Sequence, residues 1–304
     1  MAFRWAAIAG KFTFEDSRVE FHGESTKYPN EQHGAALGLA NCEGRFTGGT
    51  IKAKIRFAQI TSASACEIIA YSYPGVPALV TAGIGWDHMF VIRAWDGAKH
   101  NLLVGYGDRR NLDSERDYLL EVAVRGSQIE LKCDGVSVAS ALLPPPTGAG
   151  QVGLQCQDFS KITVTEFAVE RARPVAFAVM QFSSPYDEIY DEVVRRVCED
   201  ELEISVQRAD ETFGPGLIIE DVARQIREAD MVLAEITPAN PNVYYEVGFA
   251  HALGKPTVLL ADRSIEKLPF DVSGYRTVFY ENSIAGKGKF EKALRRHLKA
   301  ILVR

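Results

Sequence analysis

The chain is poor in the features that mark secreted, metal-binding and nucleic-acid-binding proteins. Its 304 residues include only five cysteines, none in a CxxC spacing, which indicates neither a disulfide framework nor a zinc site. Acidic residues outnumber basic ones by 40 to 34, and the formal net charge is −6. This balance argues against a surface for nucleic acid or anionic lipid. We therefore expect reduced thiols, no metal, and no direct contact with nucleic acid or membrane.

Long uninterrupted apolar runs are also lacking. The longest uncharged stretch, Ile68 to Trp86, is broken by glycine and proline, and this pattern predicts two strands joined by a turn. Near the N-terminus the apolar run spans only about six residues, which is short for the apolar region of a secretory signal. We expect a cytoplasmic protein.

What the sequence does contain falls into two halves with different hydrophobic periodicity. Over residues 1–171, short segments alternate apolar and polar side chains and are separated by Gly, Pro and Asp. The pair Asp134-Gly135 is typical of a type I′ hairpin turn, and the apolar phase slips between Val164 and Phe167, which predicts a β-bulge. Many short strands of this kind predict an all-β sandwich or jelly roll.

Residues 174–304 instead alternate strands with helices. The segment 175–182, VAFAVMQF, is continuously apolar, which is typical of a strand buried on both faces. Further strands are predicted at 203–207, 230–236, 257–261 and 276–280, and helices at about 186–201, from 217, from 240 and at 288–301. This alternation predicts an α/β domain with a doubly wound, flavodoxin-like parallel sheet of about five strands.

In such a sheet, ligands bind beyond the carboxyl ends of the strands, where the strand order reverses. With the order 2-1-3-4-5, that crevice lies between the strand ending at Phe182 and the strand ending at Ile236, and three loops rich in polar, acidic or glycine residues meet there. The predicted substrate-binding residues are Gln181, Phe182, Ser183, Ser184, Tyr186, Asp210, Phe213, Gly216, Asn240, Asn242 and Tyr245.

The residues of the first two loops can also be explained without a role in ligand binding. Ser183 and Ser184 precede a predicted helix, where hydroxyl and free N–H groups can hold a phosphate or a ribose. Alternatively, Ser184 caps that helix, with Pro185 in its first turn. Asp210 either faces the site or is an ordinary solvated loop residue.

The third loop carries the candidate catalytic residue, Glu246. Asn240 is a predicted N-cap and Pro241 fills the first helical position, so Glu246 lies about a turn and a half inside the helix. Its aromatic neighbours, Tyr245 and Phe249, suit the wall of a partly buried pocket, where a carboxylate becomes more basic. The alternative is a surface glutamate that the helix dipole stabilises. We interpret His251 as a packing residue.

Four segments, taken in order, resemble the TIR-like and nucleoside 2-deoxyribosyltransferase-like domains of bacteria. They are FAVMQFSSPYDEIYDEV, RADETFGPGLIIEDV, IREADMVLAEIT and NPNVYYEVGFAHALGKPTVLL. The resemblance covers about residues 175–262 and implies that Glu246 attacks or stabilises the anomeric carbon of a ribose while an N-glycosidic bond breaks. In the transferases an Asp stands six residues before this Glu, where this chain has Asn240. TIR domains of bacterial immunity hydrolyse NAD and often need self-assembly, which implies a homo-oligomer with NAD as substrate and no cofactor.

Leaving-group chemistry separates the possible substrates. Nicotinamide leaves NAD as a neutral base from a cationic glycoside, so a single carboxylate can suffice. A neutral nucleoside requires proton delivery to the base, for which Asp210 is the candidate. The prominent Glu246 therefore favours cleavage of NAD. Together with this chemistry, the resemblance to TIR domains implies a TIR-like NAD glycohydrolase that is an anti-phage immune effector activated by ligand or assembly. The alternatives are a nucleoside or deoxynucleotide N-hydrolase or 2-deoxyribosyltransferase, and a non-catalytic nucleotide-binding signalling module.

The N-terminal half resembles concanavalin A-like (laminin-G-like) jelly rolls. The resemblance is carried by GGTIKAKIRF, AGIGWDHMFVIRAWDG, YLLEVAVRGSQIELKCDGVSVAS and GQVGLQC. It implies a sensor or assembly module, with a sugar or another small ligand as its partner. Trp86, His88 and Trp95 form either an aromatic sugar platform or part of the packing.

Overall fold

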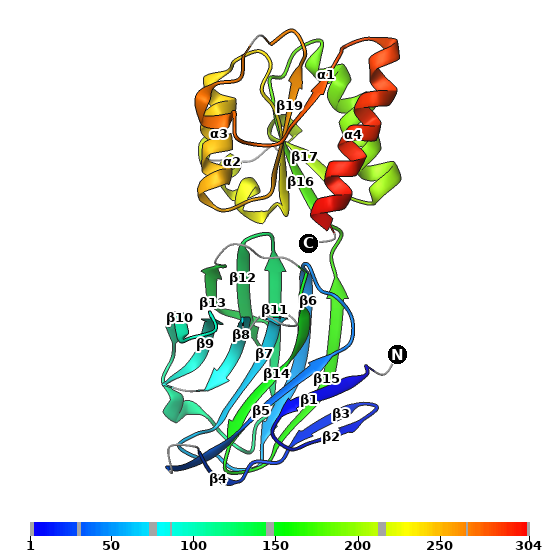
Figure 1. Cartoon of the computed structure of the whole chain (residues 1–304). Helices are drawn as coiled ribbons and strands as arrows, with labels where there is room; N and C mark the ends of the chain where they lie inside the picture. The colour runs from blue at the N-terminus through cyan, green and yellow to red at the C-terminus, as the bar shows by residue number, and fades with distance from the viewer. Residues whose placement is uncertain are drawn as a thin grey trace. The chain divides into compact units, whose positions relative to one another are not determined.

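The computed structural model describes residues 3–28, 32–72, 78–85, 87–143, 149–211, 217–265 and 267–302. The chain divides into two compact units (Figure 1). Nearly all of residues 1–172 form the first unit, and the second is formed mainly by Arg173–Arg304. Three predicted positions, Trp86, Phe213 and Gly216, lie outside the described residues. None of the helices in the described ranges is long and apolar enough to span a membrane.

The first unit is a sandwich of two antiparallel sheets. In the described residues, one sheet has eight strands in the order β1-β5-β14-β7-β8-β9-β10, with β4 paired to β5. Its strands are β1 (Trp5–Ala9), β4 (Ser25–Lys27), β5 (His33–Cys42), β7 (Ala65–Ser72), β8 (Leu79–Gly85), β9 (His88–Trp95), β10 (His100–Tyr106) and β14 (Gln151–Asp158).

The other sheet has seven described strands in the order β13-β12-β11-β6-β15-β3-β2. They are β2 (Phe12–Glu15), β3 (Arg18–Phe21), β6 (Gly49–Phe57), β11 (Tyr118–Arg125), β12 (Gln128–Cys133), β13 (Val136–Leu142) and β15 (Ile162–Arg171). A short 3-10 turn, η1 (Arg109–Asn111), precedes β11. The predicted all-β, jelly-roll-like sandwich is confirmed.

Alternation along the strands builds the core of the sandwich. Every second residue of β6 from Ile51 to Phe57 is fully buried, while the residues between them are not. The predicted bulge is present, because β15 shifts register against β6 between Thr165 and Ala168. The turn between β12 and β13 has positive φ at both Asp134 and Gly135, as a type I′ hairpin requires.

The second unit contains a parallel sheet of five described strands in the order β17-β16-β18-β19-β20. They are β16 (Val175–Val179), β17 (Ser205–Arg208), β18 (Met231–Glu235), β19 (Thr257–Asp262) and β20 (Thr277–Tyr280). In chain order this is 2-1-3-4-5, so the predicted flavodoxin-like sheet is confirmed. The first strand is shorter than predicted, since it ends at Val179, before the polar loop begins.

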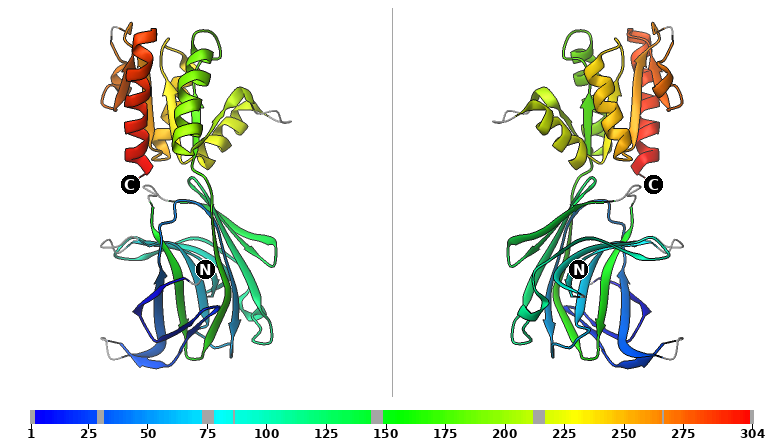
Figure 2. Two further views of the ribbon diagram at one scale, coloured as in Figure 1. Left: turned by 90° about the vertical axis from the view of Figure 1, so that its right-hand side faces the viewer. Right: turned by 90° about the vertical axis from the view of Figure 1, so that its left-hand side faces the viewer.

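Helices cover both faces of this sheet (Figure 2). They are α1 (Tyr186–Ile189), continuous with the π-helical η2 (Tyr190–Glu201), then α2 (Ile218–Glu228), α3 (Pro241–Ala252) and α4 (Ile284–Leu302), with 3-10 turns η3 (Ala209–Glu211) and η4 (Phe270–Val272). Residues of η2 and α4 pack on one face, and residues of α2 and α3 pack on the other. Both faces of β16 and β18 are therefore buried, which explains their continuous apolar sequences.

Candidate active site

A cavity of about 390 Å³ opens at the carboxyl ends of β16 and β18, where the strand order of the parallel sheet reverses. Its walls come from the residues after β16, from η3, and from the first two turns of α2 and α3. It is lined by Met180, Gln181, Phe182, Ala209, Ile218, Ile219, Val222, Asn240, Asn242, Val243, Tyr245 and Glu246. The fold thus brings together five of the predicted binding residues with the predicted catalytic one.

Local sequence fixes where α3 begins and thereby places Glu246. The Asn240 side chain accepts a hydrogen bond from the Asn242 N–H at 3.0 Å, and Pro241 occupies the first turn. Val243 and Val247 are buried against the sheet on the same helix. As a result, Glu246 lies at the edge of the buried stripe and in the cavity wall.

The Glu246 carboxylate is half-buried and stands alone. It makes no hydrogen bond or ion pair with any residue in the part of the chain that the structure describes. Burial raises its pKa to about 7, because the apolar surroundings disfavour the charged form. A free carboxylate of raised basicity, facing a cavity, is suited to attack or stabilise an electrophilic carbon.

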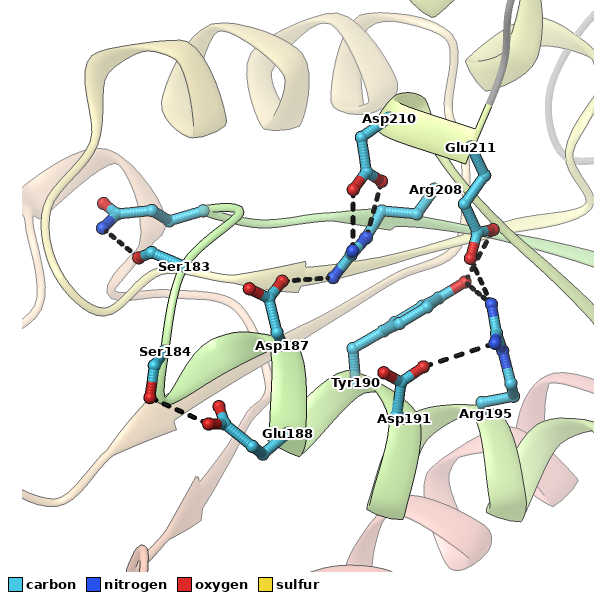
Figure 3. Close-up of polar contacts among 11 residues, drawn as sticks. Ser183, Ser184, Asp187, Glu188, Tyr190, Asp191, Arg195, Arg208, Asp210 and Glu211 are labelled. Carbon is cyan, nitrogen blue, oxygen red and sulfur yellow. Dashed lines mark hydrogen bonds and ion pairs between the residues drawn. The ribbon is translucent and has the colours of Figure 1, made fainter.

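The serines after β16 lie outside the cavity lining. Ser183 Oγ accepts a hydrogen bond from Gln181 Nε2 at 2.8 Å, and Ser184 Oγ donates to Glu188 Oε1 at 2.9 Å (Figure 3). Ser184 is not the helix cap considered from the sequence: Pro185 occupies the N-cap position, and no side chain caps α1. Tyr186, in the first turn of α1, is half-buried and is also outside the lining.

Asp210 is held by Arg208 instead of facing the cavity as a free acid. Arg208 Nε and Nη2 donate to the two Asp210 carboxylate oxygens at 2.6 and 2.7 Å (Figure 3). Arg208 Nη1 donates to Asp187 Oδ1 at 2.8 Å. Arg208, the last residue of β17, thus connects Asp187 on α1 to Asp210 on η3. The guanidinium also lies 4.5 Å from the Tyr190 ring centroid and 5.2 Å from that of Phe182.

A second group of ion pairs lies beside the first at the rim of the cavity, by which we mean α1, η2 and η3. Tyr190 donates its hydroxyl to Glu211 Oε2 at 3.2 Å, and Arg195 forms ion pairs with both Asp191 and Glu211 (Figure 3). These contacts connect η2 to η3. Arg208, which ends β17, was not singled out from the sequence, although it holds Asp210 and Asp187 beside the cavity.

The cavity wall is almost free of charge. Within the described residues Glu246 is the only charged side chain of the lining, and no lysine or arginine belongs to it. Gln181, Asn240 and Asn242 supply amide groups to the wall, and Phe182 and Tyr245 supply aromatic rings.

Two of the three sandwich residues considered as a sugar platform, His88 and Trp95, contact residues of β10. The ring centroids of Trp95 and His100 lie 4.6 Å apart. The His88 ring packs against Gly105 of β10. A Cβ added to Gly105 would lie only 2.2 Å from this ring. The described ranges hold no group of three or more His, Cys, Asp or Glu that could bind a metal ion.

Comparison with known proteins finds one family match and a set of similar solved structures. Residues 180–277 match the family described as nucleoside 2-deoxyribosyltransferase. Similar solved structures include the carbohydrate-binding module CBM66 from Bacillus subtilis, at 14% identity and TM-score 0.44, which covers 54% of this chain and 92% of that chain. Another is a β-glucanase from Bacillus licheniformis, at 11% identity and TM-score 0.39, which covers 56% of this chain and 92% of that chain.

At such identities and TM-scores these structures add no argument about ligands, and the jelly-roll-like assignment rests on the strand order. Comparison with curated proteins gives no significant match. The TIR part of the resemblance stays a prediction. The C-terminal unit contains a nucleoside 2-deoxyribosyltransferase-like domain.

Proposed function

We propose that the C-terminal unit breaks the N-glycosidic bond of a nucleoside, with Glu246 acting at the anomeric carbon. One observation carries the proposal: an unpaired, half-buried carboxylate lines the cavity at the point where the strand order reverses. All the residues that line this cavity lie within the segment 180–277 that matches the nucleoside 2-deoxyribosyltransferase family.

The chemistry requires a nucleophile that is ionised and basic. A Glu246 oxygen forms a bond to C1′ of the sugar while the bond from C1′ to the base nitrogen breaks. The bonding electron pair leaves with the base, which takes up a proton from a water molecule. The resulting glycosyl ester is then opened by water, which gives free sugar, or by the nitrogen of a second base, which gives a new nucleoside. A pKa of about 7 keeps a large fraction of Glu246 ionised at neutral pH.

The composition of the wall favours an uncharged substrate. Phe182 and Tyr245 offer aromatic faces for a nucleobase, and the amides of Asn240 and Asn242 can hydrogen-bond sugar hydroxyls. A phosphate group would meet no cation in the described lining and would lie near the negative Glu246. Nucleosides and 2′-deoxynucleosides are therefore the favoured class over their phosphates.

NAD is the second candidate substrate, and one observation favours it. Glu246 is the only carboxylate in the described lining, and nicotinamide can leave without protonation by a second acid. The pyrophosphate of NAD would again lack a counter-charge. A part in bacterial immunity, self-assembly, a sugar ligand for the sandwich and a cytoplasmic location stay predictions.

Base release by the full chain tests the proposal. The protein is incubated, at low and high concentration, with nucleosides, 2′-deoxynucleosides, their 5′-monophosphates and NAD, and the free base is separated by chromatography. Nucleosides should react faster than their monophosphates. Glu246→Gln should lower the rate by about 10²-fold or more, the usual range for one positioned catalytic group. Glu220→Gln, an exposed carboxylate of α2, is the matched control and should leave the rate unchanged.

Each contrary result has a definite meaning. Equal rates for wild type and Glu246→Gln would rule out the assigned role of Glu246. Preferential release of nicotinamide would replace the nucleoside by NAD. Binding of nucleosides without release of any base, at every protein concentration, would indicate the non-catalytic binding module.

A further inference from the structure

A second polar group lies buried at the carboxyl ends of β18, β19 and β20, outside the cavity lining. Glu235 is the last residue of β18 and is only 2% exposed. Asp262 ends β19, and Tyr280, which is 3% exposed, ends β20. Burial, and after it the nearby Glu235, raises the pKa of Tyr186 on α1 and of Tyr244 on α3. Residues from four other elements thus lie around the carboxyl group of Glu235.

The surroundings of Glu235 suit a neutral acid. Its Oε1 accepts the Thr237 N–H at 2.8 Å, and the described part of the chain places no cation against it. The buried Oε2 forms no hydrogen bond in that part of the chain. The Tyr280 hydroxyl is near enough to lower the pKa of Glu235, but the effect of burial is larger. Burial raises the pKa of Glu235 to about 8, and the negative Asp262 acts in the same direction. At neutral pH the group is therefore mainly protonated.

Glu235 is connected to the active-site helix through a short loop. Its carboxyl group holds the Thr237 N–H, and the Thr237 hydroxyl in turn accepts the Asp262 N–H at 3.0 Å. The loop continues from Thr237 to Asn240, the residue that caps α3. The position of this loop therefore sets the start of α3 and, through it, the place of Glu246 in the cavity wall.

We propose that Glu235 is a positioning residue that, as a neutral acid, fixes the loop 236–239 from which the Glu246 helix starts. The role rests on the proposed function of Glu246. Ionised Glu235 would be a buried charge without a counter-ion, beside the carboxylate of Asp262. The chain can relieve this cost only by opening the loop to water, which would displace α3. Glutamine at this position keeps the shape and the acceptor oxygen but cannot ionise.

The sign of the pH effect follows from proton binding. The folded protein holds the Glu235 proton up to about pH 8, whereas an unfolded glutamate releases it near its model value of 4.5. The folded state therefore binds more protons in this window, and the free energy of unfolding falls as pH rises through it. Glu235→Gln removes this contribution and leaves every other titrating group in place.

The experiment compares wild type, Glu235→Gln, Glu235→Ala and the control Glu220→Gln in the full chain. Thermal unfolding is followed from pH 5 to 9.5, and base release from nucleosides is measured over the same range. We expect the melting temperature of Glu235→Gln to rise relative to wild type between about pH 5 and 9. Base release by wild type should fall above about pH 8, roughly tenfold per pH unit, and this fall should be absent in Glu235→Gln. Glu235→Ala, which loses the loop contact, should lose activity at every pH.

Thermal unfolding needs no substrate, so it tests Glu235 even when no base is released from any compound. An identical pH dependence of melting in wild type and Glu235→Gln overturns the proposal. A loss of more than about tenfold in base release by Glu235→Gln at pH 7 overturns it as well, because the proton of Glu235 would then act in the reaction itself. If Glu235→Ala fails to fold, the glutamine variant still decides.

Discussion

Arg208 holds both carboxylate oxygens of Asp210, with its Nε 2.6 Å from Oδ1 and its Nη2 2.7 Å from Oδ2. This two-point contact is the strong geometry for a guanidinium and a carboxylate. It uses the carboxylate that sequence analysis offered as a proton donor. The structure thus assigns Asp210 to the rim that carries the cavity, together with Asp187 on α1.

Asp210→Asn should therefore weaken the fold more than the chemistry. We expect the free energy of unfolding to fall by about 1 kcal/mol, because one charged hydrogen bond is lost at a part-exposed site. The pH profile of base release should keep its shape. Urea unfolding and initial rates measure the two effects, and Asp221→Asn, which removes an exposed pair with Arg224 on α2, is the control. A rate loss of about 10²-fold without a stability change would restore Asp210 as the acid.

Glu246 should make the protein less stable as the pH rises toward neutrality. Its folded pKa of about 7 lies above the model value of 4.5, so the folded state binds more protons between these two values. Glu246→Gln should therefore melt at a higher temperature than wild type above about pH 7, with the difference shrinking toward pH 5. Base release should rise with pH through about 7, as the carboxylate ionises. If the melting temperatures of wild type and Glu246→Gln change with pH in the same way across this range, the buried setting of Glu246 is contradicted.

Asn240 offers a test of the position where the related transferases carry Asp. Asn240→Ala removes the cap on Asn242 and should cost about 1 kcal/mol of stability. Asn240→Asp keeps a good cap but adds a negative charge to the same cavity wall as Glu246. A like charge raises the pKa of a carboxyl group, so the acidic limb of the rate profile should move to higher pH. If the acidic limb of the rate profile stays at the same pH, the charge at position 240 does not affect the pKa of Glu246.

Gly248 lies two residues after Glu246, on the exposed face of α3. A Cβ added there meets no atom within 4 Å. Gly248→Ala should therefore stabilise the helix by roughly 0.5–1 kcal/mol and leave base release unchanged. Denaturant unfolding and initial rates provide the measurements. A fall in the rate together with the gain in stability would indicate that substrate or a second chain approaches this glycine closely.

The class of both folds could be predicted from periodicity. Alternation of period two identified the sandwich, down to the bulge near Thr165 and the turn at Asp134-Gly135. Continuous apolar strands between helices identified the parallel sheet, because both of its faces must be covered. The end of the first parallel strand was predicted wrongly. The apolar segment runs over residues 175–182, but the strand ends at Val179, where its pairing with the neighbouring strand ends.

The site was predicted in part, and the misses share one cause. Glu246, Asn240 and Asn242 belong to one continuous segment, whose cap and apolar stripe fix their direction. Ser183, Ser184 and Asp210 were assigned from loop position alone, and in the structure their side chains bond to neighbours. Glu235 was not singled out at all. The residues around it come from four other elements that are distant in the sequence.

The sequence by itself determined the secondary structure and the start of α3, because caps, turns and apolar spacing act over a few residues. It therefore determined that Glu246 follows a capped helix start beside a buried strand. Only the tertiary structure decided which polar groups stay free. Burial and pairing depend on side chains that meet across the sheet, and this is why Arg208 takes up Asp210, Glu235 is buried beside Asp262, and Glu246 faces the cavity alone.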